Sequence, residues 1–286
     1  MPPNSSSIVL RVRWCFGVAL FLALSMAVHA GMIPPVGKNF KISDLELDLI
    51  WVDPGVFSMG SQAEEAADKA ETPPTRVTLT HGFWLGRTEV TQAQYLAIAG
   101  VNPSHFTGEG TSAPVERVSW IEAMAYCDKL TKRERAAGRL PANYVYTLPT
   151  EAQWEYACRA GTTGQYAGDP EKISWYDSNS SETTHPVAQR QPNQWGFYDM
   201  AGNVLEWCAD WYGNYPGGAV TDPAGPAEGF FRMARGGSWR SKLDVGRSAA
   251  RSGASPARRD YTLGFRVALS FENKPSPRES SPGSHR

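Results

Sequence analysis

The sequence predicts an α+β domain with little regular secondary structure and many loops. Two kinds of local signal support this fold class: three short helices that each begin with a capping motif, and a set of short strand-like segments around them. The 286 residues include 27 Gly, 21 Pro and 10 Trp, a composition typical of turns and large aromatic anchors. We therefore expect short elements held together by loops.

Helices are expected to begin after Thr91, Ser119 and Thr150. Each of these residues is followed three positions later by Gln or Glu, which is the capping-box pattern that satisfies backbone N–H groups at a helix start. Glycines stand where the three helices would end, at positions 100, 138 and 161. The second helix carries one apolar face, formed by Trp120, Met124, Cys127 and Leu130.

Short runs of β-branched and aromatic residues predict the strands. Between the first two runs, Asp53-Pro54-Gly55 predicts a hairpin turn. The expected strands are Ile50–Val52, Val56–Met59, Arg76–Leu79, Phe83–Leu85, Val145–Thr147 and Gly264–Leu269.

The two ends of the chain are expected to lie outside the fold. Arg11 and Arg13 precede a mostly apolar run over residues 14–28, and Val28-His29-Ala30 resembles a signal-peptide cleavage site. We therefore expect an exported protein, periplasmic or extracellular, with no stable membrane span after cleavage. The expected organisation is a signal peptide at 1–30, a lead-in at 31–48, one domain at 49–270 and a disordered tail at 271–286, rich in Pro, Ser and charge.

Charge is distributed unevenly along the chain. The formal net charge is −1, and the composition does not indicate nucleic-acid binding. Residues 232–266 hold eight Arg and one Lys against two Asp, a balance of +7. This excess is explained either by ion pairs with acidic residues elsewhere in the chain or by an arginine-lined cleft for an anionic or extended peptide ligand.

Seven motifs follow one another along the expected domain. In chain order they are FSMG at 57–60, FWLGRTEVT at 83–91, PVERVSW at 114–120, LPTEAQWEYA at 148–157, GFYDMAGNVLEW at 196–207, RGGSW at 235–239 and GFR at 264–266. Together they closely resemble the formylglycine-generating enzyme, or sulfatase-modifying factor, family. The resemblance implies a variant of the C-type-lectin fold over most of the expected domain. It also implies oxidation of a sulfatase cysteine to formylglycine, with copper held by two cysteine thiolates.

The copper-binding cysteines of that family have no counterpart here. The resemblance places them just after the Gly-Gly-Ser motif, yet residues 236–270 contain no Cys, and Ser241 stands about where the first would fall. The second would fall within residues 242–247. A hydroxyl is a poor ligand for monovalent copper, so we expect no copper-thiolate chemistry. Ser238 matches the active-site serine of the family and is the only catalytic candidate, with a turn residue as its alternative.

Three cysteines remain after the expected cleavage point: Cys127, Cys158 and Cys208. Cys127 and Cys158 match positions that form disulfides in some relatives. The positions of their partners are occupied here by Val267 and Ser248, which cannot form a disulfide. We expect buried thiols; a bridge between Cys127 and Cys158 is the alternative, and a zinc site is not indicated by the spacing.

The segment 199–206 resembles the calcium turn of the family. The resemblance implies that the side chains of Asp199 and Glu206 and the carbonyls of Gly202 and Val204 bind one structural calcium ion. Calcium accepts hard oxygen ligands of this kind; the alternative is a Gly-Asn turn with Glu206 paired to an arginine. For a second calcium site known in relatives, Asp177, Asn179 and Glu182 are weak candidates. No other cofactor is expected.

Aromatic residues near this turn either pack in the core or line a sugar- or peptide-binding cleft. They are Trp195, Phe197, Tyr198, Trp207, Trp211, Tyr212 and Tyr215.

Two functions are compatible with the sequence. The first is a lectin-like binding module that holds a peptide, a glycan or a partner protein, or that acts by chemistry without copper thiolates. The alternative is a formylglycine-generating oxidoreductase. Fold alone does not decide between them, and the absence of the thiols favours the first.

Overall fold

The structure is a computed structural model that describes residues 34–62 and 68–271. The expected signal peptide and all but the first residue of the expected tail lie outside these residues. Within them, no helix combines the length and the apolar character that crossing a membrane requires.

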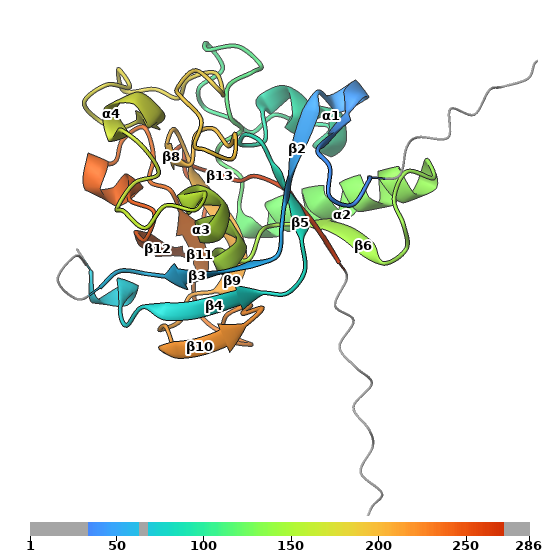
Figure 1. The fold of residues 1–286 in the computed structure, drawn as a ribbon. Coiled ribbons are helices and arrows are strands. Elements are labelled where there is room, and N and C mark those ends of the chain that lie inside the picture. The colour runs from blue at the N-terminus through green and yellow to red at the C-terminus, as the bar shows by residue number, and fades with distance from the viewer. Residues whose placement is uncertain (1–33, 63–67, 272–286) are drawn as a thin grey trace, which may run out of the picture. The chain divides into compact units, whose positions relative to one another are not determined.

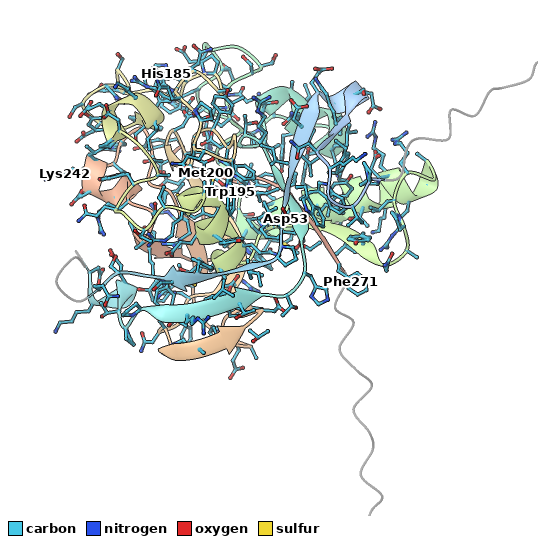
Figure 2. All side chains as sticks on the ribbon, viewed as in Figure 1. Asp53, His185, Trp195, Met200, Lys242 and Phe271 are labelled. Carbon is cyan, nitrogen blue, oxygen red and sulfur yellow. The ribbon has the colours of Figure 1, made fainter. Side chains whose placement is uncertain are left out.

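The largest sheet has five antiparallel strands and includes both ends of the described fold (Figure 1). Its centre is β5, which pairs with β2 through Ile50–Leu85 and with β14 through Ala268–Leu85. Side chains fill the space between this sheet and the neighbouring elements (Figure 2). In spatial order the strands are β1 (Phe40–Ile42), β2 (Leu47–Val52), β5 (Phe83–Gly86), β14 (Ala268–Phe271) and β6 (Tyr144–Thr147).

A second sheet contains three strands. Figure 1 shows it beneath α3. It consists of β3 (Gly55–Met59), β4 (Thr75–Leu79) and β10 (Gly218–Thr221), with β10 parallel to β4. Because β2 and β3 belong to different sheets, Asp53-Pro54-Gly55 does not form the predicted hairpin turn. It carries the chain from one sheet to the other, and the hairpin prediction is wrong.

A third sheet carries the segments of the candidate site. Its order is β12 (Arg251–Ala254), β11 (Arg232–Arg235), β9 (Leu205–Trp211) and β13 (Leu263–Gly264). The predicted strand Gly264–Leu269 is therefore divided: its start pairs with β9 here, whereas its end is β14 of the first sheet. A short parallel pair joins β7 (Ser174–Trp175) to β8 (Ala201–Gly202).

The three predicted helices are confirmed together with their capping boxes. In each, the N-cap hydroxyl accepts from the backbone N–H three residues later, and that residue's side chain accepts from the N-cap N–H. The helices are α1 (Gln92–Ala99), α2 (Trp120–Ala136) and α3 (Glu151–Arg159); α4 (Pro170–Ile173) and the 3₁₀ turns Ser43–Leu45, Lys69–Glu71 and Leu243–Gly246 complete the described set.

The core consists of two clusters of buried side chains. One packs α1 and α2 against the large sheet and contains Cys127 and Leu130. The other packs α3 between the sheets and contains Trp154, Cys158 and Cys208. All three thiols are free and buried, as the sequence predicts, and no bridge joins Cys127 to Cys158.

Candidate functional site

The Gly-Gly-Ser motif forms a tight turn directly after β11. Gly236 and Gly237 have positive φ angles of 93° and 72°. A Cβ on Gly237 would lie 3.2 Å from the carbonyl oxygen of Val245, so a larger residue would crowd the neighbouring segment. This turn places Ser238 beside Ser241.

The two hydroxyls of this turn face one another. Ser238 Oγ lies 3.0 Å from Ser241 Oγ, and the Ser238 N–H donates to Ser241 Oγ at 3.0 Å. The N–H of Ser241 donates in turn to the Ser238 carbonyl at 2.9 Å. Both serines therefore satisfy polar groups of the turn, which is the alternative role that the sequence leaves open for Ser238.

Next to this turn lies a pocket of about 400 Å³, which we call the Trp239 pocket. Its aromatic side chains contact each other edge-on or tilted. Measured between ring centroids, Phe106 lies 5.2 Å from Trp239, and Trp239 lies 5.9 Å from Tyr261. Trp239 is held in place because its indole N–H donates to the Tyr261 carbonyl at 3.1 Å. The pocket is lined by His105, Phe106, Asp177, Ser180, Glu182, Trp239, Arg240 and Tyr261.

Charged groups stand at the edge of the Trp239 pocket. Asp177 and Glu182 are exposed, and Arg240 donates to the Tyr261 hydroxyl. Behind the pocket, buried Glu116 accepts from the N–H groups of His105 and Phe106, which fixes that wall. Burial raises the pKa of the Glu116 carboxyl to about 7, against the lowering effect of these two hydrogen bonds.

The segment 199–206 is a strained turn that brings carboxylates together in the interior. Asp199 and Asn203 have positive φ angles of 56° and 58°. A Cβ on Gly202 would lie 1.8 Å from the Trp175 carbonyl oxygen, so only glycine fits there. Asp199 and Glu206 are both buried.

Glu89 is a buried member of this cluster that the sequence analysis does not single out. Its carboxylate accepts from the Val204 N–H at 2.9 Å and from the Asn203 side-chain amide at 2.8 Å. Burial, followed by the charges of Asp199 and Glu206, raises its pKa well above the usual value. In the sequence, nothing in the segment RTEVT distinguishes Glu89 from a solvent-exposed glutamate. Only the fold shows that Glu89 faces this turn.

The chain matches the family described as "Sulfatase-modifying factor enzyme 1-like domain" over residues 40–271. This chain belongs to that family. Its described part therefore has the α+β formylglycine-generating-enzyme fold, with little regular secondary structure.

Curated relatives carry different names. Over 254 residues the chain is 31% identical to "Chaperone protein LppX" of Paenibacillus barcinonensis, covering 72% of this chain and 82% of that protein. It is 28% identical to the formylglycine-generating enzyme of Mus musculus, covering 77% and 74% of the two chains. It is also 32% identical to "Serine/threonine-protein kinase pkn1" of Chlamydia caviae, but it spans only 39% of that protein's length.

Two solved structures are similar over most of the chain. Treponema denticola variable protein 1 has a TM-score of 0.73 and 33% identity, covering 82% of this chain and 99% of that one. PvdO from Pseudomonas aeruginosa has a TM-score of 0.72 and 26% identity, covering 83% and 99%.

The sulfatase-modifying factor fold does not bring a thiol to the Ser238 turn. Burial raises the pKa of Cys158 to about 11, and it also raises the pKa values of Cys127 and Cys208. The Cys158 thiol donates to Met200 O and Ser248 Oγ at 3.8 and 3.6 Å, inside the core. These protonated, enclosed thiols are poor nucleophiles and poor metal ligands.

The 199–206 turn, for which the family resemblance implies calcium, is only partly free to bind an ion. Asp199 Oδ1 is buried and has no hydrogen-bond partner among the described residues, and the charges of Asp199 and Glu206 act on Glu89 together with that of Arg266. These features fit a cation. Both oxygens of Glu206, however, accept from Arg266 at 2.6 Å, so this ligand would be shared with an ion pair.

Within residues 34–62 and 68–271, no group of three or more His, Cys, Asp or Glu side chains is placed so that it could hold a metal ion, and this includes the buried carboxylates near Arg266. The weak candidates for a second calcium site have other surroundings. Asn179 caps its own turn, accepting from the Tyr176 N–H at 2.9 Å and donating to the Ser174 carbonyl at 3.1 Å. Asp177 and Glu182 line the Trp239 pocket. Calcium at the 199–206 turn remains a proposal.

The arginine-rich region 232–266 mostly forms internal ion pairs, as the first of the two sequence alternatives predicts. Its buried guanidiniums contact acidic side chains of other elements. The pairs are Arg235 with Glu155, Arg247 with Glu71, Arg251 with Glu151 and Arg266 with Glu206.

The aromatic residues near the 199–206 turn lie partly in the core and partly at the surface. Phe197, Trp207 and Tyr215 are buried core residues. Trp211 packs against the guanidinium of Arg232 at 3.5 Å. Trp195 instead lines a surface pocket.

Proposed function

We propose that this sulfatase-modifying factor family member is an exported binding module that holds a peptide segment of another protein in the Trp239 pocket, without copper-thiolate chemistry. One observation carries the proposal. Two serine hydroxyls, 3.0 Å apart, occupy the turn where the family resemblance implies the first copper-binding thiol. Hard oxygen donors do not retain monovalent copper against competing soft ligands.

The lining of the Trp239 pocket supports a peptide ligand. Trp239 and Tyr261 offer large aromatic surfaces of the kind that anchors protein interfaces. At the rim, the two negative charges of Asp177 and Glu182 outnumber the one positive charge of Arg240, which favours Lys or Arg side chains on the ligand. The name of the Paenibacillus relative, a chaperone protein, agrees with a function that consists of binding other polypeptides.

A first experiment separates binding from the alternative, formylglycine formation. The chain is incubated with copper, oxygen and a peptide containing Cys-x-Pro-x-Arg, with the mouse formylglycine-generating enzyme as the positive control. We expect mass spectrometry to find the peptide cysteine unchanged. Loss of sulfur with formation of the aldehyde would overturn the proposal.

A second experiment tests the pocket itself. Heptapeptides displayed on phage are selected on the immobilised chain, and the affinities of enriched peptides are measured by fluorescence anisotropy. We expect enrichment in Lys or Arg next to an apolar residue, with binding weakened about tenfold in the Asp177→Asn/Glu182→Gln variant and by Tyr261→Ala. The matched control, Glu228→Gln, removes an exposed carboxylate outside the pocket. Equal affinity for all variants would contradict the proposed site.

A further inference from the structure

We propose that a second pocket, separate from the peptide site, binds a neutral oligosaccharide. This pocket has a volume of about 490 Å³, which is within the range of ligand sites, about 300–1,000 Å³. It shares no lining residue with the Trp239 pocket. We call it the aromatic groove and define it by the side chains of Phe57, Tyr156 and Trp195 together with the loop 161–165.

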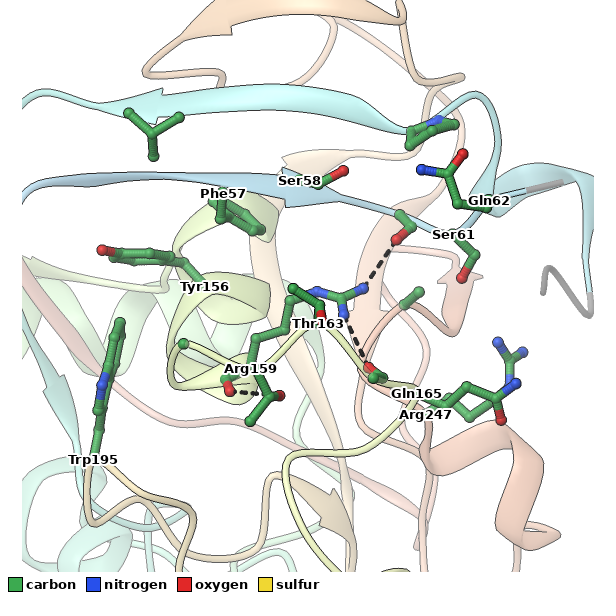
Figure 3. A pocket seen from close by; sticks show the side chains of 17 residues that line it. Phe57, Ser58, Ser61, Gln62, Tyr156, Arg159, Thr163, Gln165, Trp195 and Arg247 are labelled. Atoms are coloured by element: carbon green, nitrogen blue, oxygen red, sulfur yellow. Dashed lines mark hydrogen bonds between the residues drawn. The ribbon is translucent and has the colours of Figure 1, made fainter. Parts of the chain in front are cut away.

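Three aromatic rings form a row along one side of the groove (Figure 3). Phe57 lies 5.1 Å from Tyr156, and Tyr156 lies 4.9 Å from Trp195, measured between ring centroids. The rings come from β3, from α3 and from the segment before β8. All three are only half-buried, so each presents surface to the groove.

The position of the central ring depends on a glycine in β3. A Cβ on Gly55 would lie 2.0 Å from the Tyr156 hydroxyl oxygen, so the absence of a side chain lets the helix approach the strand. The backbone at the Trp195 end is held by Asn193, whose side-chain oxygen accepts from the Trp195 main-chain N–H at 3.1 Å. Contacts within the fold therefore set the position of the row at its centre and at its Trp195 end.

Neutral polar side chains also line the groove. Ser58, Gln62, Thr163 and Gln165 line the groove and are exposed. None of their side chains forms a hydrogen bond with the part of the chain that the structure describes. They offer two hydroxyls and two amides, each able to donate and to accept.

The arginines of the groove are already committed to the protein. Arg159 donates to Glu155 at 2.8 Å and to the carbonyls of Gly60 and Gly164 at 2.9 and 3.1 Å, and the last two bonds are drawn in Figure 3. Arg247 forms a fork with Glu71, with both N–O distances below 2.9 Å. The groove thus supplies no uncommitted guanidinium for a phosphate, sulfate or carboxylate.

The chemistry of the lining points to a sugar. Aromatic rings pack against the C–H faces of pyranose rings, and hydroxyl and amide side chains pair with sugar hydroxyls. A proline-rich peptide could also pack on the rings, but proline has no N–H to donate, so such a peptide makes fewer hydrogen bonds with the four polar side chains than a hydroxyl-rich ligand does. An anionic sugar would lose solvation without gaining a free cation.

The test measures binding by isothermal titration calorimetry with the full chain. The probes are cellotetraose, chitotetraose and mannotetraose, with decaproline and tetragalacturonate for comparison. We expect one or more of the neutral tetrasaccharides to bind with one-to-one stoichiometry. Trp195→Ala should weaken that binding about tenfold, because one of the stacking surfaces is lost.

Two further variants separate loss of the site from loss of the fold. Thr163→Trp adds bulk at an exposed position inside the groove and should abolish binding while leaving the melting temperature unchanged. Phe230→Ala removes an aromatic ring that is 90% exposed and lies outside the groove, and it should bind as the unaltered chain does. The proposal is overturned if no neutral tetrasaccharide binds, if Trp195→Ala and Thr163→Trp leave binding intact, or if decaproline alone binds in a Trp195-dependent way. None of these outcomes bears on the Trp239 pocket, so this proposal and the peptide proposal fail separately.

Discussion

Arg266 and Glu206 form a completely buried ion pair in which Nε and Nη2 of the guanidinium each lie 2.6 Å from a different carboxylate oxygen. The same guanidinium donates to backbone carbonyls of Gly86 and Tyr198 at 3.0 and 2.9 Å. Arg266 therefore links the loop after β13 to the first and third sheets, and it offsets part of the negative charge of Glu89 and Asp199.

Replacing this arginine should be costly. Arg266→Met leaves Glu206 buried without its partner, and we expect the free energy of unfolding in urea to fall by about 3–5 kcal/mol. The control is Arg259→Met, which removes an arginine that pairs with Glu122 and is 60% exposed; its expected effect is about 1 kcal/mol or less. An equal loss of unfolding free energy in the two variants would show that the buried ion pair of Arg266 contributes no more than an exposed one.

Calcium should stabilise the native chain if it binds the 199–206 turn. An ion that binds only the folded state raises the melting temperature, so EDTA should lower it by about 5 °C or more and added calcium should restore it. Asp199→Asn should remove this response and leave the Arg266–Glu206 ion pair in place. Glu206→Ala should also lower the melting temperature as EDTA does, but it removes the partner of Arg266 as well. A melting temperature indifferent to EDTA in the unaltered chain would eliminate calcium.

Stability should also fall as the pH rises from 5 to 8. Burial, followed by the charge of Glu151, raises the pKa of Asp210 in the folded state to about 7. The folded state therefore holds a proton that the unfolded state has already lost above its own, lower pKa, and the stabilising contribution is lost as pH approaches 7. We expect the contribution of Asp210 to the free energy of unfolding to fall by about 2 kcal/mol across this window.

Asp210→Asn isolates that contribution, because the amide does not titrate and its oxygen can still accept from the Glu151 N–H. The fall between pH 5 and 8 should be smaller by about 2 kcal/mol in this variant, measured by chemical denaturation at each pH. An identical pH profile for the two proteins would rule Asp210 out as a source of the dependence.

Soft ligands placed in the Ser238 turn should change its affinity for metal. The Ser238→Cys/Ser241→Cys variant puts two sulfur atoms where two hydroxyl oxygens now lie, and we expect it to retain copper(I) after desalting under reducing conditions. Elemental analysis of the unaltered chain, treated in the same way, should find no copper. Stoichiometric copper in the unaltered chain would refute the argument from ligand softness.

Local signals are the part of this fold that the sequence predicts well. A capping box needs only residues i and i+3, so Thr91, Ser119 and Thr150 mark the starts of α1, α2 and α3 without knowledge of the rest of the chain. The motifs likewise identify the family. The strands expected from short runs of β-branched and aromatic residues also begin and end close to the strands in the structure.

Contacts between residues that are distant in the sequence cannot be predicted from local patterns. Gly55 resembles a turn residue, yet a Cβ there would lie 2.0 Å from the Tyr156 hydroxyl oxygen, and the hairpin prediction fails because β2 and β3 belong to different sheets. Glu89 carries no sign in its own segment that the Val204 N–H will meet it. The last predicted strand is likewise interrupted at Arg266, whose buried ion pair with Glu206 exists only in the tertiary fold.

The position of the three thiols has a consequence for how the protein can be handled. Cys127, Cys158 and Cys208 are all enclosed in the core, so an alkylating reagent reaches them only when a molecule opens. The rate of labelling by iodoacetamide therefore reports how often native molecules open, and an oxidant added to the folded protein meets no accessible sulfur in its described cysteines. Incorrect disulfides between these cysteines can form only in the nascent chain, before the side chains of the two core clusters pack.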